Sequence, residues 1–308
     1  MSFEPGKDYL CDLLDFAMPW LDGMAAVLIA HVDASKRPSG VFSVGLVAFG
    51  ADRAKKATRG WDRLWGKTSC HMTDWHARRG PFTDWSADKS HGRLVESLGI
   101  VNRYASYAVA VSCDAADVEK LAPKGADANS KVFHDGLARS YALCCHMAMY
   151  SLARLAPGAR QNPPRIAYFF ESGDAHQGES QRFISEVVSG PMGAALYGCR
   201  SHSKLAKTDS RLFEIADIVA WEWAKHIDRI GEGKTQMRGS LKALLGEGHS
   251  SEFDFASDSR VMMHMRGPAL ERFYLRCEET GIFSDHPTPE QTATALENAK
   301  RSSLFYSA

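Results

Sequence analysis

Three acidic side chains, far apart in the sequence, stand at positions from which they could share one site. Asp33 follows the apolar run 24–32, and Glu171 closes the apolar run 165–171. In open α/β sheets, ligands bind where parallel strands end, so neighbouring strands would direct these two carboxylates into one crevice. Asp217, in "FEIADIVAW", falls at the edge of the buried arc of a helix and can reach past the helix rim toward them.

Carboxylates gathered in this way need a positive partner. Like charges repel, so at least one acid would keep its proton at neutral pH without a cation. Mg²⁺ and Mn²⁺ accept oxygen ligands, and a pair of such ions activates water and stabilises the leaving oxygen of a phosphodiester. The residue types therefore predict metal-assisted phosphodiester hydrolysis. Asp33, Glu171 and Asp217 would be the catalytic and metal-binding residues, with Mg²⁺ or Mn²⁺ as the cofactor.

Other roles for these acids stay open. An aspartate at a strand end is often a turn residue or a helix cap. Asp174, in "ESGD", is an equally good turn former and an equally good metal ligand, and the pattern does not choose between it and Glu171. Asp174 is therefore a fourth metal-binding candidate.

The elements that would position the acids follow from the hydrophobic pattern. Apolar runs predict five strands, at 24–32, 41–49, 105–113, 165–171 and 194–199. Helical periodicity predicts helices at 8–22, 87–103, 134–156 and 210–230. The short polar connection "DASKRPSG" favours an antiparallel hairpin between the first two strands. This order predicts an α/β fold with a mixed sheet, in which the first three strands are antiparallel and later ones parallel, flanked by helices.

Two segments lie outside this plan. We expect one domain at 1–230, with an N-terminal helix and a helical insertion at 51–104, and a helical C-terminal extension at 231–308. The extension carries apolar positions that indicate a helix packed on the core or on a second subunit, namely Val261, Met262, Leu270, Phe273 and Leu275. A homodimer is therefore one arrangement that the sequence allows.

The composition argues against several protein classes. Lys plus Arg equals Asp plus Glu, at 37 each, so net charge gives no evidence for a nucleic-acid partner. The seven cysteines form no CxxC pair, which argues against a disulfide framework or a cysteine zinc site. Phosphate-loop and nucleophile-elbow motifs are absent from the sequence. The N-terminal stretch lacks a basic region, and its longest apolar run is too short to span a bilayer, so we expect a cytoplasmic protein without a membrane segment.

A basic and aromatic run at 52–67 is a local indication of a nucleic-acid partner. It holds six cations and two tryptophans, namely Arg53, Lys55, Lys56, Arg59, Arg63, Lys67, Trp61 and Trp65. Basic groups contact phosphates, and aromatic rings stack on bases. The alternative is an amphipathic surface helix whose tryptophans pack inward. We favour this alternative for the tryptophans, and the role of the charges stays open.

The segment "CHMTDWH" at 70–76 concentrates side chains that can bind metals. A zinc site would use Cys70, His71, Asp74 and His76. No second ligand pair stands at a usual spacing, so the pattern gives zinc little support. A histidine beside a phosphodiester site can instead orient water or contact a phosphate oxygen.

Four motifs together resemble the domain of unknown function 3800 family. They are "HVDAS", "CHMTDW", "YFFESGDAHQG" and "SRLFEIADIVAWEWAK", in this order, over about residues 25–228. The resemblance implies a ribonuclease H-like fold and a nuclease site with the acids Asp33, Glu171, Asp174 and Asp217. It also implies that a His-Met-x-Asp motif, His71 and Asp74, lies over the same site, and that Lys204 faces a phosphate.

The motifs depart from the family pattern at three positions. Ala34 stands where a second acid is frequent, Lys36 where glycine is frequent, and Glu214 where glutamine is frequent. Glu214 would be either a further ligand or a solvent-facing residue. These departures motivate an alternative function: a catalytically inactive module of the same fold that binds nucleic acid or protein, or a defence effector gated by a partner.

Five residues around the acids are expected to bind the substrate, namely His71, Asp74, Ser35, Lys204 and Arg211. Two of them belong to a second basic group, at 202–211, which precedes the helix that carries Asp217. The expected partner is a nucleic acid, and the sequence leaves DNA and RNA equally open.

Overall fold

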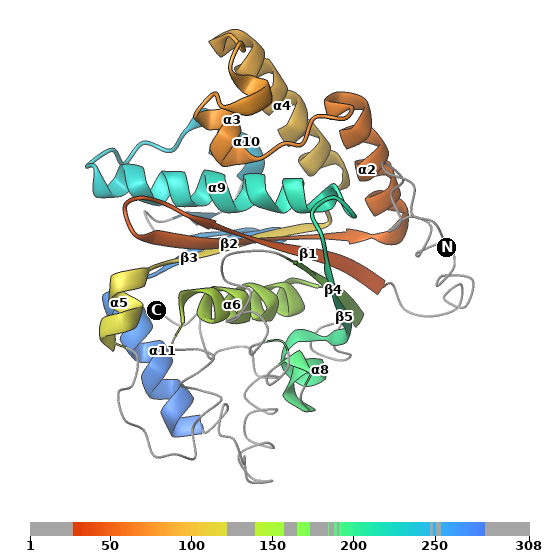
Figure 1. The fold of residues 1–308 in the computed structure, drawn as a ribbon. Coiled ribbons are helices and arrows are strands. Elements are labelled where there is room, and N and C mark those ends of the chain that lie inside the picture. The colour runs from red at the N-terminus through yellow and green to blue at the C-terminus, as the bar shows by residue number, and fades with distance from the viewer. Residues whose placement is uncertain are drawn as a thin grey trace.

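The computed structural model of this chain describes residues 27–121, 139–156, 165–172, 184, 188–189, 191–246, 249–250 and 254–280. The predicted helix at 8–22 and the candidate ligand Asp174 lie outside these residues. The described part of the chain forms three layers, in which one mixed sheet separates two groups of helices (Figure 1).

The sheet has eight strands in the described residues, in the order β5-β4-β1-β2-β3-β8-β7-β6. Their bounds are β1 Val27–Lys36, β2 Val41–Gly50, β3 Tyr107–Asp114, β4 Arg165–Glu171, β5 Cys199–Leu205, β6 His249–Ser250, β7 Asp254–Ala256 and β8 Arg260–Met265. β1, β2 and β3 are antiparallel, β4 lies parallel to β1, and β5 lies parallel to β4. This arrangement of the first five strands is the ribonuclease H-like one that we expected, so the fold class is confirmed.

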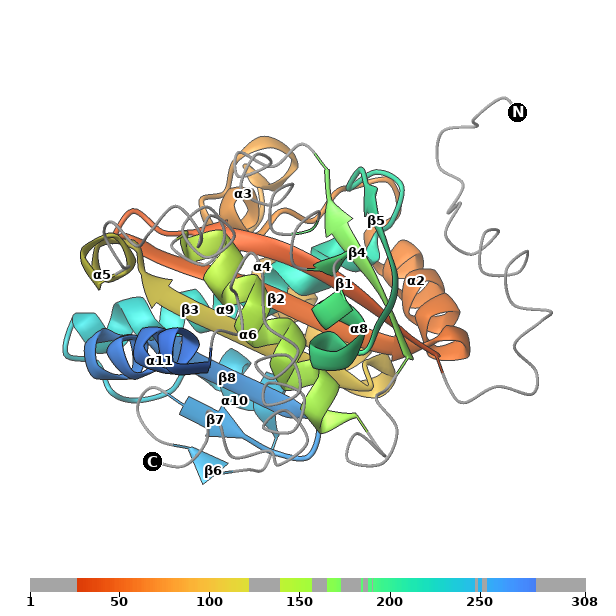
Figure 2. The same cartoon turned by 90° about the horizontal axis from the view of Figure 1, so that it is seen from below.

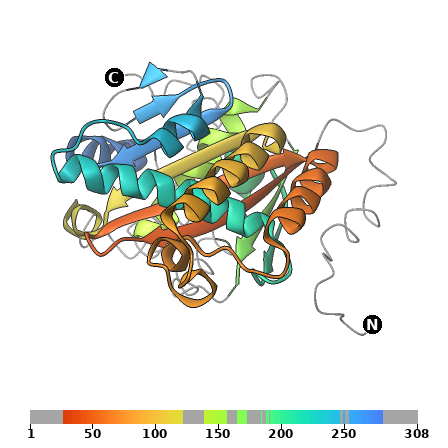
Figure 3. The ribbon, with the colours of Figure 1, turned by 90° about the horizontal axis from the view of Figure 1, so that it is seen from above.

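Helices cover both faces of the sheet. One face carries α2 Ala51–Trp65, α3 Met72–His76, α4 Ala87–Tyr104, α9 Leu212–Gly231 and α10 Gly239–Leu245, with the short helix η1 Gly80–Phe82 between α3 and α4 (Figure 3). The other carries α5 Ala115–Leu121, α6 Ser140–Leu155, α8 Pro191–Tyr197 and α11 Gly267–Thr280 (Figure 2). α6 and α9 pack directly on the sheet, which explains why both are buried around most of their circumference. Within the described chain, none of these helices combines the length and the apolar character needed to cross a membrane.

Gly45 on β2 allows α9 to lie very close to the sheet. A Cβ atom on Gly45 would lie 2.3 Å from the carbonyl oxygen of Ala216 and 2.6 Å from the backbone nitrogen of Ala220. Gly45 pairs with Asp33 across β1 and β2. The close approach therefore brings α9, the helix that carries Asp217, over the position of Asp33.

The fifth strand differs from the prediction. The run at 194–199 lies mostly in helix α8, which ends at Tyr197, and β5 is the polar segment Cys199–Leu205. β5 is an edge strand with little burial, so no apolar run marks it in the sequence.

The C-terminal part also differs from the prediction. We expected helices only, but β8 pairs in parallel with β3, and β7 and β6 extend the sheet beyond it. Val261 and Met262 therefore lie in a strand, whereas Leu270, Phe273 and the exposed Leu275 lie in helix α11. β8 is buried along its whole length, and a strand buried on both faces shows no alternation that distinguishes it from a helix. The domain boundary after residue 230 stays a prediction.

Candidate active site

Asp33 and Glu171 lie side by side where the parallel pairing between β1 and β4 ends. The ladder of aligned pairs stops one residue before both of them. Two residues earlier on each strand, the rings of His31 and Phe169 stack at 5.2 Å, on the side of the sheet that α9 covers. Because side chains alternate along a strand, Asp33 and Glu171 point to this same side. β1 continues to Lys36, so Asp33 lies inside the strand and not after it as we expected.

Helix α9 brings Asp217 to the same place from the other side. Asp217 is only 3% exposed, and its Oδ2 accepts a hydrogen bond from the backbone N–H of Met72 at 3.0 Å. Met72 is the first residue of α3. The insertion therefore lies over the acid on α9, as the resemblance implied.

The three carboxylates share one cation, the ammonium group of Lys207. Its Nζ lies 2.7 Å from Asp33 Oδ2, 3.7 Å from Asp217 Oδ2 and 3.8 Å from Glu171 Oε2. Lys207 belongs to the connection between β5 and α9, and its side chain is 17% exposed. The structure thus brings together the three acids that we expected to meet, and it adds a cation from the chain itself.

Burial and charge act in opposite directions on this cluster. Burial by itself lowers the pKa of the Lys207 ammonium, but the attraction of three carboxylates more than offsets this effect and raises the pKa above its ordinary value. Burial raises the pKa of Asp217, and the charge of Asp33 adds to this effect. Lys207 and, more weakly, His71 act on Asp217 in the opposite direction. Asp217 therefore depends on nearby positive charge to stay ionised.

The same oxygens could hold a divalent ion if Lys207 moved aside. As they stand, no three Asp, Glu, His or Cys side chains in the described part of the chain are arranged to hold a metal. The donor set nevertheless fits Mg²⁺ or Mn²⁺, because these ions prefer oxygen ligands and the carboxylates already surround one cation position. The catalytic and metal-binding roles of the acids stay predictions.

Two of the expected substrate-binding residues, His71 and Ser35, lie beside the acids. His71 is exposed at the residue before α3, next to the backbone N–H that binds Asp217. Ser35 is buried on β1, two residues after Asp33 and on the same face.

Lys204 points away from the acids, and Asp74 is paired with an arginine. Lys204 is one residue before the partner of Glu171 in the β4–β5 ladder, so its side chain points to the opposite face of the sheet. Asp74 forms an ion pair with Arg79 at 3.0 Å on the exposed surface of α3. The lysine that meets the acids is Lys207, which follows β5 at the same end of the sheet. A lysine just after a strand, at the end of the sheet where ligands bind, is the signal in the sequence that could have identified Lys207.

Arg211 makes structural contacts, and its expected role in substrate binding stays a prediction. Its guanidinium donates hydrogen bonds to the carbonyl oxygens of Gly66 at 2.7 Å and Thr68 at 2.8 Å, and lies 3.0 Å from Glu214 Oε1. Glu214 is buried, and its Oε2 accepts a hydrogen bond from the Trp61 indole at 2.6 Å. Arg211 therefore ties the loop after α2 to the start of α9. Glu214 serves this network, and it does not face solvent.

The zinc alternative finds no support in the residues that the structure describes. Burial and, after it, the charges of Glu214 and Asp217 raise the pKa of the Cys70 thiol, which disfavours the thiolate that zinc requires. His76 packs its ring against Trp221, with ring centroids 4.8 Å apart.

Helix α2 presents a basic face to solvent and buries its aromatic face. Trp61 and Trp65 are buried, and Trp65 stacks on Trp85 at 5.9 Å, so the favoured interpretation of the tryptophans is confirmed. The exposed cations on and just after the helix are Arg53, Lys56, Arg59, Arg63 and Lys67. The chain then continues from α2 to Met72, whose backbone N–H binds Asp217.

Comparisons with known proteins leave the family of this chain open. No family model matches the chain, and no curated protein matches its sequence. One similar solved structure is the ribonuclease H2 from Pyrococcus horikoshii OT3, with a TM-score of 0.35 and 12% identity, over 89% of this chain and 100% of that one. Another is RNase HII in a PCNA complex from Archaeoglobus fulgidus, with a TM-score of 0.35 and 15% identity, over 85% of this chain and 92% of that one. These similarities are too weak to carry a functional argument, so the fold assignment rests on the strand order, and membership of the domain of unknown function 3800 family stays a prediction.

Proposed function

We propose that this chain is a divalent-metal-dependent phosphodiesterase that acts on nucleic acid. The observation that supports it is the meeting of Asp33, Glu171 and Asp217, from two parallel strands and one helix, around a single cation position. Open α/β sheets bind their ligands at this end of the strands. When bound there, Mg²⁺ or Mn²⁺ would supply Lewis acidity and neutralise charge on the phosphodiester.

The chain's own residues have distinct parts in this proposal. The side chains of Asp33 and Asp217 are 3% and 4% exposed, whereas the Glu171 side chain is 20% exposed, so Glu171 is the acid nearest to a substrate. A backbone N–H of α3 fixes the orientation of the Asp217 carboxylate. His71, exposed beside it, is placed to contact a phosphate oxygen. Lys207, once displaced from the acids, would remain beside the phosphate as a positive charge.

The nucleic-acid substrate is proposed from the basic face of α2. Its exposed cations are of the type that contacts phosphate backbones without reading the base sequence. The formal net charge of the chain is zero, so any attraction would be local to this face. Lys67 is exposed on the connection that runs from α2 to Met72, the residue that binds Asp217.

The direct test replaces one acid at a time. Asp33→Asn and Asp217→Asn remove a charge at nearly constant volume, and we expect each to abolish Mn²⁺-dependent cleavage of labelled DNA and RNA oligonucleotides. Circular dichroism should show that both variants remain folded. Asp258→Asn, in the exposed turn between β7 and β8, is the matched control and should cleave like the wild type. Wild-type cleavage rates in both acid variants would overturn the proposal.

A second function is favoured by one observation, the Lys207 ammonium among the acids. A cation built into the chain satisfies the carboxylates without a metal, as expected for an inactive module that only binds nucleic acid or protein. Calorimetric titration with Mg²⁺ and Mn²⁺ separates the two functions. Metal binding supports the phosphodiesterase, whereas no metal binding by a folded protein that still binds oligonucleotides supports the module.

A further inference from the structure

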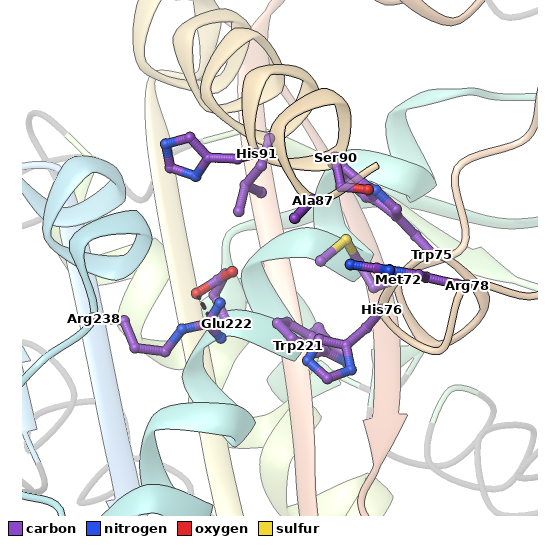
Figure 4. A pocket seen from close by; sticks show the side chains of 11 residues that line it. Met72, Trp75, His76, Arg78, Ala87, Ser90, His91, Trp221, Glu222 and Arg238 are labelled. Atoms are coloured by element: carbon purple, nitrogen blue, oxygen red, sulfur yellow. Dashed lines mark ion pairs between the residues drawn. The ribbon is translucent and has the colours of Figure 1, made fainter. Parts of the chain in front are cut away.

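A cavity of about 260 Å³ lies on the side of α9 that faces α3 and α4 (Figure 4). Its walls include Met72, Trp75 and Trp221, and Arg238 closes one side. Trp221 lies one helical turn beyond Asp217 on α9, and α3 contacts both places, so the cavity neighbours the acid site. Sites for drug-sized ligands usually measure roughly 300–1,000 Å³, so this cavity has room for a single small ring system.

The cavity contains buried polar atoms that the described residues do not satisfy. Glu222 is completely buried, and its Oε2 accepts a hydrogen bond from Ser240 at 2.8 Å and lies 3.4 Å from Arg238. Its Oε1 has no hydrogen-bond partner in the described residues, and neither have the Trp221 indole N–H and the Ser90 hydroxyl. Such atoms are rare, because leaving a buried polar group unpaired is costly. Figure 4 shows the Glu222 carboxylate directed into the cavity, where it can accept a hydrogen bond from a ligand.

Aromatic and positive groups surround these atoms. The Arg238 guanidinium lies over the Trp221 ring at 5.3 Å, and the His76 ring contacts the same indole. Arg78 and His91 add further basic side chains to the lining. Arg78 has a φ of 51°, the one positive φ of a non-glycine residue in the described chain. Strained conformations of this kind concentrate at ligand sites, and the basic lining suits an anionic group on the ligand.

We propose that this cavity binds an unpaired guanine base, with the attached phosphate toward Arg78. Guanine presents N–H donors on adjacent atoms beside a carbonyl oxygen. These groups match an ionised, acceptor-only carboxylate and a donor-only guanidinium, those of Glu222 and Arg238. Burial raises the pKa of Glu222, whereas the Arg238 charge and the Ser240 hydrogen bond favour its ionised form. Adenine and cytosine present a ring-nitrogen lone pair at the corresponding place, which would face the lone pairs of the carboxylate. A planar base also suits the apolar and aromatic walls, because such walls hold bases that have left a stack.

This proposal goes beyond the proposed function, because it concerns binding and does not require cleavage. The base belongs either to a free guanosine nucleotide or to an unpaired guanosine within a nucleic-acid strand. Both sources present the same ring edge to Glu222, so the experiment has to separate them.

Isothermal titration of the full chain with the 5′-monophosphates of guanosine, adenosine, cytidine and uridine tests the proposal. EDTA is present throughout, so the outcome does not depend on whether the acids bind a metal or cleave. We expect guanosine monophosphate to bind at least about tenfold more tightly than the other three. Glu222→Gln loses a charge-assisted hydrogen bond and should weaken this binding by at least about tenfold. Glu232→Gln, exposed just after α9, is the matched control and should bind like the wild type.

Ala87→Trp is a second variant that leaves the polar network of Glu222 intact. Ala87 is exposed at the start of α4 and lines the cavity, so a large side chain there should block the cavity without disturbing the core. We expect guanosine monophosphate binding to be lost. Equal or absent binding of all four monophosphates, or unchanged binding by Ala87→Trp, would overturn the proposal.

Single-stranded oligonucleotides with one guanosine, or one adenosine at the same position, identify the source of the base. Tighter binding of the guanosine strand than of both the adenosine strand and guanosine monophosphate assigns the cavity to an unpaired base in nucleic acid. Binding of the monophosphate alone assigns it to a free nucleotide.

Discussion

Replacing Lys207 by methionine would separate the structural and metal-binding roles of the acid cluster. Methionine keeps most of the side-chain volume and removes the ammonium, which lies 2.7, 3.7 and 3.8 Å from Asp33, Asp217 and Glu171. At an effective dielectric constant of about 20, these charge pairs interact by about 6, 4 and 4 kcal/mol. Desolvation cancels most of this gain, and removal of one partner of a buried pair costs about 3–5 kcal/mol. We expect a loss near the lower value, because Asp217, whose pKa burial raises, can take up a proton when the ammonium is gone.

The same substitution should strengthen metal binding. In the wild type, a divalent ion has to compete with the Lys207 ammonium for the same oxygens. Removing a competitor worth about 3 kcal/mol should lower the Kd for Mn²⁺ by about 100-fold. Since an ion that binds only the folded state stabilises it, Mn²⁺ should restore stability to Lys207→Met more than it adds to the wild type.

Thermal unfolding in EDTA and in rising Mn²⁺ concentrations measures both effects. Lys242→Met, exposed on α10, is the control and should show neither. A Lys207→Met protein that is destabilised in EDTA but gains nothing from Mn²⁺ would refute the idea that the acids form a cation site open to metals. Cleavage assays of Lys207→Met then determine the role of Lys207. Unchanged or faster cleavage indicates that its ammonium only occupies the metal position, whereas slower cleavage with tighter Mn²⁺ binding indicates that it acts at the phosphate.

Two further predictions concern the fold that carries the site. Gly45→Ala places a methyl group 2.3 Å from the Ala216 carbonyl oxygen and should lower the free energy of unfolding by at least about 2 kcal/mol in urea, whereas Gly99→Ala, in open space on α4, should raise it by about 0.5–1 kcal/mol. A Gly45→Ala protein as stable as the wild type would show that α9 does not need its close approach to β2. Burial lowers the pKa of His146 to about 3, with its Nδ1 2.6 Å from the Tyr197 hydroxyl. The unfolded state therefore binds more protons between about pH 6.5 and about pH 3, and stability falls as the pH decreases through this window. Burial lowers the pKa of His31 to about 3 as well, so two histidines contribute to the acid sensitivity of the wild type. Between about pH 7 and about pH 5, His146→Gln should therefore lose about 2 kcal/mol less stability than the wild type in urea unfolding; equal acid sensitivity in both proteins would rule this histidine out as a cause.

The central elements of the fold are visible in the sequence because burial leaves a pattern there. β1 to β4 lie in the middle of the sheet as apolar runs, and α9 shows a buried arc. Asp33 and Glu171 stand out because each interrupts or ends such a run. β5 leaves no pattern because it is a polar edge strand, and β8 leaves an ambiguous one because it is buried throughout.

The contacts of the polar residues could not be predicted in the same way. Lys204 and Lys207 are three positions apart, and only the register of an edge strand and the turn after it decide which of them reaches the acids. Arg211 binds the carbonyl oxygens of Gly66 and Thr68, so its role depends on how the insertion docks on α9. Periodicity in the sequence carries no information on such docking.

The raised pKa of Lys207 decides how the acids can become available to a metal. The surrounding carboxylates stabilise the ammonium, so a moderate rise in pH does not remove its charge. The acids are released when another cation takes their oxygens, and this release is easiest when another anion takes the ammonium. A metal ion and a phosphate group together satisfy both conditions, because the ion binds the carboxylates and the phosphate pairs with the displaced lysine. Metal and nucleic acid should therefore each strengthen the binding of the other by the same factor, since such coupling is reciprocal. A module that binds nucleic acid on the basic face of α2 alone would leave Lys207 where it is and would show no such coupling.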